Sequence, residues 1–181
     1  MPASKTKTLP IETMAEGKFL RLAKRGRWEY VERVNSSGAV VIVAVTPEDK
    51  LLLVEQFRVP LQKNVIELPA GLMGDIAGQE HEAMAIAAER ELLEETGYHA
   101  GNFQELWTGP TTAGLADEIV SFLLATQLEH RTAGGGDEHE EIVVHEIPMN
   151  GIVDHLRSLE AKGLVIDTKI FTGLYFLGQK S

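Results

Sequence analysis

The stretch that decides the fold runs from Glu67 to Tyr98 and reads ELPAGLMGDIAGQEHEAMAIAAERELLEETGY. Its second half predicts a helix from about Glu82 to Thr96, and Gly97 follows as a typical helix terminator. A glycine-spaced loop leads into this helix. Three glutamates on the helix fall at positions i, i+3 and i+4 and therefore share one face: Glu91, Glu94 and Glu95.

This acidic face favours a metal site. Close carboxylates on a helix repel one another by roughly 0.2–0.5 kcal/mol per pair, so a bound cation would relieve an unfavourable arrangement. Carboxylate oxygens suit Mg²⁺, with Mn²⁺ as a substitute. A solvated acidic face without a role is the ordinary alternative for such a run. The glycine loop before the helix and Gly97 after it favour the metal site.

Composition limits the classes of function. The chain has 181 residues, 44% hydrophobic and 24% charged, as expected for one globular domain. A net charge of −10 disfavours nucleic-acid or anionic-membrane partners. There is no cysteine, and the six histidines show no HxxxH or HExxH spacing, so a zinc site is not expected. No apolar run approaches the roughly 20 residues of a membrane span, and no signal peptide is evident, so we expect a cytoplasmic protein.

The hydrophobic pattern predicts an α+β fold. Alternating residues at Phe19–Ala23 and Trp28–Val34 indicate an N-terminal β-hairpin, whereas Gly38–Thr46 is apolar throughout and predicts a strand buried on both faces. Met1–Ala15 is expected to be loosely ordered or to reach a partner subunit. Further strands are expected at Leu51–Phe57, Asn64–Leu68, Phe103–Trp107, Ile119–Thr126 and Ile142–Ile147, and helices at Asn150–Lys162 and Asp167–Leu177. These elements predict a three-layer sandwich around a mixed sheet.

The helix resembles the signature of Nudix hydrolases, G-x5-E-x7-R-E-U-x-E-E-x-G-U, where U is aliphatic. Seven residues separate Glu82 from Arg90, and the family's glutamates and glycine follow in register at Glu91, Glu94, Glu95 and Gly97. The first half departs from the signature. Ile76 stands where the glycine is expected, and ten residues separate Gly71 from Glu82, so Glu80 competes with Glu82 for the leading acidic position.

Other segments are similar to the branch of this family that acts on ADP-ribose and nucleoside diphosphate sugars. They are Gln56-Phe57-Arg58 before Glu67–Gly71, Trp28-Glu29 with Arg33, and the segment DEHEEIVVHEIP at residues 137–148. Thr112-Ala113-Gly114 stands where ADP-ribose-preferring members usually carry Ser-Pro-Gly, so other nucleoside diphosphate sugars stay open.

The resemblance implies an enzyme and a fold. It implies a Nudix-type α/β/α sandwich and metal-dependent hydrolysis of the substrate's diphosphate to a nucleoside monophosphate and a sugar phosphate. Residues 1–36 would serve dimerisation and base binding, and residues 37–181 would form the hydrolase domain of a homodimer. Two alternatives are a ligand-sensing module of the same shape and a hydrolase of dinucleoside polyphosphates.

The resemblance also implies roles for residues at the phosphates. Arg90 would orient the glutamates, and Glu95 would act in catalysis as well as in metal binding. The implied metal ligands are Glu91, Glu94, Glu95 and the backbone carbonyl of Ala70. Counting eight residues back from Pro148 assigns the general base to Glu140, with Glu138 and Glu141 as rivals.

Substrate recognition is expected from side chains outside the signature. Trp28 would stack on the base and Glu29 would bond to its edge, although Trp28 also suits a core or a dimer interface. Arg33 and Arg58 would bind the diphosphate, because a planar guanidinium fits phosphate oxygens. Asp117 and Glu118 would contact the terminal sugar or a metal.

Overall fold

The computed structural model of the chain describes residues 9–74, 83–136 and 141–179. Its strands are β1 (Glu12–Glu16), β2 (Leu20–Arg25), β3 (Trp28–Arg33), β4 (Gly38–Ala44), β5 (Lys50–Arg58), β6 (Lys63–Glu67), β7 (Ala70–Met73), β8 (Tyr98–Pro110), β9 (Ile119–His130), β10 (Ile142–Pro148) and β11 (Val165–Ile166). Its helices are α1 (Met84–Thr96), α2 (Ile152–Glu160) and α3 (Lys169–Gly178).

The strands form three sheets among the described residues. β1, β2 and β3 make an antiparallel sheet, which we call the N-terminal sheet. A second sheet has the order β7-β4-β9-β8, with β4 and β9 parallel. The third has the order β10-β5-β6-β11, with β6 and β11 parallel. The predicted α+β fold and N-terminal hairpin are confirmed, although two mixed sheets replace the single sheet expected.

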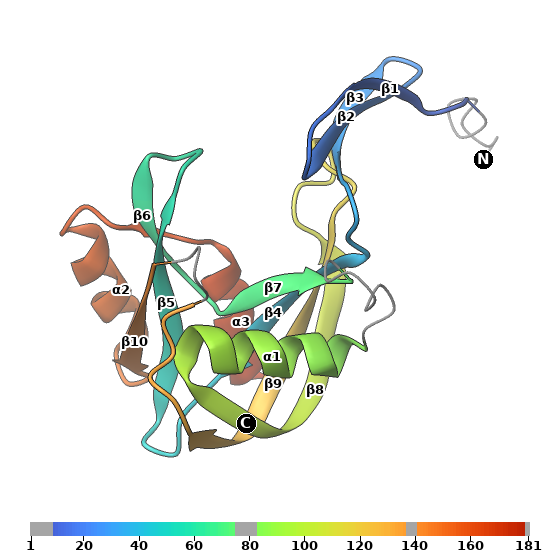
Figure 1. The fold of residues 1–181 in the computed structure, drawn as a ribbon. Coiled ribbons are helices and arrows are strands. Elements are labelled where there is room, and N and C mark those ends of the chain that lie inside the picture. Colours follow the sequence, from blue (N-terminus) through green and yellow to red (C-terminus); the bar gives the residue numbers. More distant parts are fainter. Residues whose placement is uncertain (1–8, 75–82, 137–140, 180–181) are drawn as a thin grey trace.

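Strand β4 organises the layers because both of its faces are buried. Val40 and Ile42 pack with Leu92 of α1, whereas Val41 and Val43 pack on the other side with α2 and α3. A β-branched run without polar residues supplies both faces at once, as the sequence predicted. Figure 1 shows α1 across one face of this sheet, with α3 behind it.

Helix α1 buries one face. Its fully buried side chains include Ala87, Ala88 and Leu92, and Glu95 is also buried. Ile86 is 61% exposed on the opposite side. The helix therefore lies on the surface of the sheet, and its acidic face is set at the border between the covered and exposed sides.

The N-terminal sheet projects from the body as an arm (Figure 1). It is attached at Val31, whose N–H donates to the Leu115 carbonyl at 2.8 Å. Every residue of β1 is exposed, and apolar side chains across the arm remain exposed, among them Met14, Phe19, Leu20 and Trp28. Such an exposed apolar surface is typical of an interaction site. Among the described ranges, no helix is long and apolar enough to cross a bilayer.

Candidate functional site

A cavity of about 890 Å³ opens where the two mixed sheets, α1 and α3 meet. Its size falls in the range of small-molecule sites. Apolar side chains of the sheets line its floor, among them Val41 and Phe122. The charged groups that line it come from separate segments: Glu91, Glu94, Glu95 and Arg90 from α1, Arg58 and Glu67 from β5 and β6, Asp167 and Lys169 near α3, and Arg33 with Glu118 at the root of the arm.

Gly71 of β7 lets α1 approach the cavity closely. A Cβ atom at this position would lie 1.9 Å from Cδ of Glu91 and 2.0 Å from its Oε1. The Glu91 carboxyl group therefore occupies the space that any other residue at position 71 would fill. This contact is the structural reason for a glycine at position 71 of β7.

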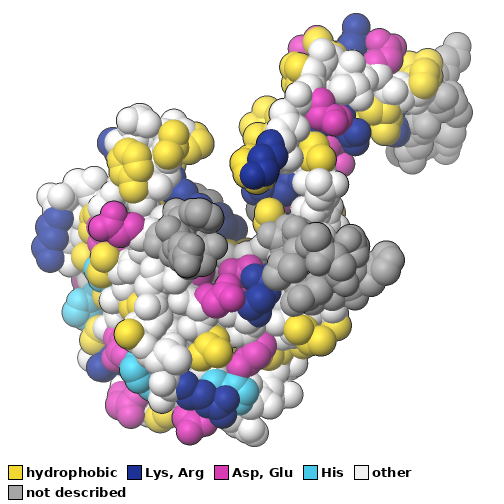
Figure 2. Space-filling view, in the orientation of Figure 1, with side chains coloured by type: hydrophobic (Ala, Val, Ile, Leu, Met, Phe, Trp, Pro, Cys, Tyr) yellow, Lys and Arg dark blue, Asp and Glu magenta, His cyan; other side chains and the backbone are white. Residues whose placement is uncertain are grey.

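A hydrogen bond fixes Glu95 against β7, and Arg90 contacts the other two glutamates of α1. The Ala70 N–H donates to Oε2 of Glu95 at 3.1 Å, which places the Ala70 peptide beside this buried carboxylate. Nη1 of Arg90 lies 2.7 Å from Oε1 of Glu91 and 3.6 Å from Oε2 of Glu94. Arg90 thus contacts both carboxylates, in the arrangement expected of a residue that orients them (Figure 2 shows acidic and basic side chains together along this edge of α1).

The carboxylates of Glu91, Glu94 and Glu95 do not converge on one point in this structure. In the ranges that the structure describes, no three carboxylate or imidazole groups are arranged to hold a metal ion. Glu91 is turned toward Arg90, and the side chain of Glu94 is 47% exposed. Their donor chemistry nevertheless fits a divalent cation, because hard carboxylate oxygens from one helix face are the ligands that such ions prefer. Glu80 and Glu82 lie outside the described residues.

An ion pair between neighbouring strands forms the opposite wall of the cavity. Nε of Arg58 donates to Oε2 of Glu67 at 2.5 Å. Burial raises the pKa of Glu67, and the positive charge of Arg58 opposes that rise. The pair holds the Arg58 guanidinium at the cavity, and Arg58 is one of the two arginines expected from the sequence to bind the diphosphate.

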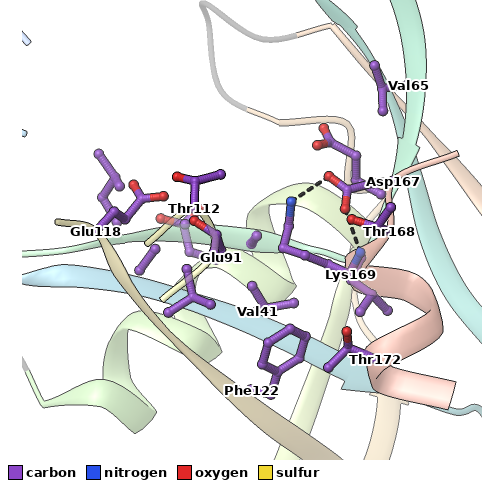
Figure 3. Close-up of a pocket in the computed structure, with 18 of the residues that line it drawn as sticks. Val41, Val65, Glu91, Thr112, Glu118, Phe122, Asp167, Thr168, Lys169 and Thr172 are labelled. Atoms are coloured by element: carbon purple, nitrogen blue, oxygen red, sulfur yellow. Dashed lines mark hydrogen bonds and ion pairs between the residues drawn. The ribbon is translucent and has the colours of Figure 1, made fainter. Parts of the chain in front are cut away.

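A second charged pair stands next to it at the start of α3. Lys169 pairs with Asp167, and Figure 3 shows the Lys169 side chain running from α3 toward the middle of the cavity, on the side away from Glu118 and Thr112. The sequence predicted a helix here but gave no role to these residues. They reach the cavity because β11 pairs in parallel with β6, a two-residue pairing that leaves no pattern in the sequence.

The root of the arm forms the third side. Arg33 of β3 makes an ion pair with Glu118, so these two predicted substrate residues are brought together at the cavity. Trp107 of β8 also lines the cavity and stacks on Phe176 with ring centroids 6.2 Å apart. From the sequence, Trp107 is predicted only as a strand residue, because an aromatic side chain in a strand most often serves packing.

Trp28 and Glu29 do not line the cavity of their own chain. Both are exposed, and they lie five and four residues before Arg33 along β3. At about 3.3 Å per residue, Trp28 is roughly 16 Å from the cavity edge along the strand. Their role in base binding stays a prediction.

A glycine run joins the loop of the predicted base to α1. The N–H groups of Gly135 and Gly136 donate to the carbonyls of Glu95 and Glu94 at 2.9 and 3.0 Å. These bonds occupy carbonyls at the C-terminal end of the helix, which would otherwise lack partners. Glu138 and Glu140 lie outside the described residues, and Glu141, which follows them, is exposed.

Comparisons with known proteins agree on one family. A model of the NUDIX domain matches residues 36–161. The chain is 35% identical to an ADP-ribose pyrophosphatase of Bacillus subtilis (strain 168), over 99% of this chain and 96% of that protein. It is 30% identical to a methanol dehydrogenase activator of Bacillus methanolicus, over 94% and 91%. It is also 30% identical to a GDP-mannose pyrophosphatase of Salmonella paratyphi B, over 76% and 72%.

A solved structure shares the fold. The structure described as an ADP compounds hydrolase superposes with a TM-score of 0.72 at 21% identity, covering 94% of this chain and 91% of that one. At this identity the likeness concerns the fold alone.

Proposed function

The chain belongs to the Nudix hydrolase family, and we propose that it hydrolyses the diphosphate bond of nucleoside diphosphate sugars, ADP-ribose or a related compound, to a nucleoside monophosphate and a sugar phosphate. The observation that carries the proposal is the cavity itself. The acidic face of α1 lines one side, and Arg58 and Arg33 line the others. The absence of a side chain at Gly71 leaves room for the Glu91 carboxyl group. Relatives named for ADP-ribose and GDP-mannose support this substrate class.

The charge of the cavity supports a cation-dependent reaction. Among the described residues that line it, six carboxylates face four cationic side chains, a formal balance of −2 when all are ionised. A diphosphate is itself anionic, so it would be repelled unless divalent ions bound with it. Nudix hydrolases generally require divalent metal ions, and we assign Mg²⁺ here, with Mn²⁺ as a substitute.

The metal ligands that we propose are the carboxylates of Glu91, Glu94 and Glu95 together with the Ala70 carbonyl. Such ions would neutralise phosphate oxygens and lower the pKa of a bound water. Arg90 holds Glu91 and Glu94 in place through its two contacts. Arg58 and Arg33 would bind the phosphates and lock the P–O–P group in line with the attacking water.

The general base that we propose is Glu140, which would take the proton of that water. The length of the connecting chain supports this assignment. Gly136 is bonded to the Glu94 carbonyl, and four residues of chain extend at most about 14 Å. On the other side, the Ile142 N–H donates to the Gly135 carbonyl at 3.2 Å, so Gly136 and Ile142 both lie near the C-terminal end of α1.

The N-terminal residues 1–36 are proposed to serve dimerisation. The exposed apolar residues of the arm suit pairing with a second copy, and a three-stranded sheet with an unburied face gains stability from such packing. Because Trp28 and Glu29 are remote from their own cavity, they would reach the base of a substrate bound to the partner copy. Light scattering of the purified protein tests the dimer, and Phe19→Asp is expected to shift it to monomer.

A substrate panel tests the proposed reaction. It contains ADP-ribose, GDP-mannose, UDP-glucose, a dinucleoside polyphosphate and a nucleoside triphosphate, each with Mg²⁺ and with EDTA. We expect a nucleoside monophosphate from one or more of the three nucleotide sugars, with Mg²⁺ only. Preferential hydrolysis of the dinucleoside polyphosphate would move the chain to that branch, and no hydrolysis of any compound would favour a ligand-sensing module.

A further inference from the structure

The start of α3 presents a set of polar groups to the cavity that the roles above do not use. Lys169, Asp167, Thr168 and Thr172 all line it, and Figure 3 shows Lys169 reaching into the cavity from α3. Glu67 is close enough to Asp167 and Lys169 for their charges to act on its pKa. Thr168 and Thr172 are four residues apart and so lie on one side of the helix start. The Lys169 side chain is 28% exposed, which places its charge at a solvated wall of the cavity.

Asp167 is fixed from several directions. Its N–H donates to the Ile66 carbonyl at 2.9 Å, and its own carbonyl accepts the Ile170 N–H at 3.2 Å. Oδ1 of Asp167 accepts the Lys169 N–H at 2.7 Å, while Oδ2 pairs with the Lys169 ammonium. Asp167 therefore caps the start of α3 through Oδ1 and positions the Lys169 side chain through Oδ2. The cap does not depend on the Lys169 ammonium.

The backbone of this helix start is already occupied. The N–H groups of Lys169, Ile170 and Phe171 all donate within the turn. An anion arriving here would therefore be held by side chains. Thr168 makes no side-chain capping bond, so its hydroxyl is not needed by the helix. The positive end of the α3 dipole adds a modest preference for negative charge.

We propose that Lys169, together with the hydroxyls of Thr168 and Thr172, binds the phosphate of the diphosphate that lies farther from the α1 glutamates. This inference rests on the function proposed above and adds a subsite to it. If one phosphate is held beside the α1 glutamates, the other would face the wall on which Lys169 lies. An ammonium is a compact charge with three donors, suited to the tetrahedral array of phosphate oxygens. The Lys169 ammonium can turn from Oδ2 of Asp167 to the phosphate while Oδ1 of Asp167 still accepts the Lys169 N–H at the helix start.

The experiment compares Lys169→Gln with Lys162→Gln, a matched change at an exposed lysine outside the cavity. Calorimetry with Mg²⁺ measures binding of the α,β-methylene analogue of ADP-ribose, which cannot be hydrolysed. We expect Kd to rise about tenfold or more in Lys169→Gln, the factor carried by one charge-assisted hydrogen bond, and to stay unchanged in Lys162→Gln. Lys169→Arg should recover part of the affinity, and KM for ADP-ribose should change more than kcat.

Unchanged Kd in Lys169→Gln would overturn the inference. Thr172→Val, which keeps the shape of the side chain, provides a second test if Lys169→Gln does not fold. It should weaken binding several-fold, and wild-type affinity in this variant would equally contradict the subsite. Failure of the proposed function is distinguishable, because it would appear as a wild-type protein that hydrolyses no member of the substrate panel.

Discussion

Replacing Gly71 with alanine tests how the loop and the acidic helix fit together. The added Cβ would lie 1.9 Å from Cδ of Glu91. Carbon atoms in contact prefer separations of at least about 3.5 Å, so the Glu91 carboxyl group must retreat by roughly 1.6 Å. A misplacement of about 1 Å at a catalytic group can reduce turnover about 10²-fold, and we expect a loss of that order in the Gly71→Ala variant.

Stability should change little in the same variant. The clash falls on Cγ, Cδ and Oε1 of the Glu91 side chain and not on backbone atoms, and Gly71 does not have a left-handed backbone conformation. Alanine also reduces the freedom of the unfolded chain, which stabilises a protein by about 0.4–1 kcal/mol at compatible sites. We expect the free energy of unfolding from urea titration to stay within about 1 kcal/mol of wild type. Gly178→Ala, where an added Cβ meets nothing within 4 Å, is the matched control.

A double-mutant cycle identifies Glu91 as the cause. If alanine acts only by displacing the Glu91 carboxyl, then Gly71→Ala should cost nothing further in a Glu91→Ala background. The assay is kcat for ADP-ribose with saturating Mg²⁺ in the wild type, both single variants and the double variant. Full turnover in Gly71→Ala, or additive losses in the double variant, would refute the contact as the origin of the effect.

Three further predictions concern the loop, pH and the helix end. Glu140→Gln should reduce kcat by about 10²-fold or more while Glu141→Gln stays active; the reverse in a steady-state assay would move the base to Glu141. Burial and a hydrogen bond to Glu146 raise the pKa of Tyr98 to about 12. Its neutral form is favoured in the fold, so its contribution is complete below about pH 10 and is lost as pH rises toward 12; the stability gap between wild type and Tyr98→Phe in urea titrations should narrow above pH 10, and a constant gap would contradict this. Gly97→Ala places a Cβ 2.0 Å from the Thr132 carbonyl at a φ of 78°, so we expect unfolding to become easier by about 1–3 kcal/mol, and a wild-type melting temperature would contradict that contact.

The elements that the sequence predicts best are those whose pattern is decided locally. The apolar run that became β4 and the terminated acidic helix that became α1 both carry their own signal. β1 has no such signal, because all its residues are exposed and only pairing with β2 makes it a strand. β7 was expected as a loop because it contains Gly71, yet its pairing with β4 holds it extended.

The candidate site divides in the same way. The residues of α1 could be predicted, because helical spacing alone puts their carboxylates on one face. The α3 wall could not, since Lys169 reaches the cavity only through the parallel pairing of β11 with β6. The N–H groups of Gly135 and Gly136 bond to carbonyls at the end of α1, a contact that residue type alone does not predict. Contacts between distant segments, not residue type, decide these features.

The most direct measurement of the central claim follows ADP-ribose by ³¹P NMR with the wild-type protein, with EDTA and with the Glu95→Gln variant. Glu95 is buried beside Ala70, so this change keeps its shape while removing a carboxylate oxygen. The account predicts that wild type with Mg²⁺ converts the diphosphate signals into those of AMP and ribose 5-phosphate. EDTA should abolish the conversion, and Glu95→Gln should slow it by about 10²-fold or more at unchanged melting temperature. Hydrolysis that persists in EDTA, or a Glu95→Gln variant as fast as wild type, would contradict a metal-dependent diphosphatase built on the acidic face of α1.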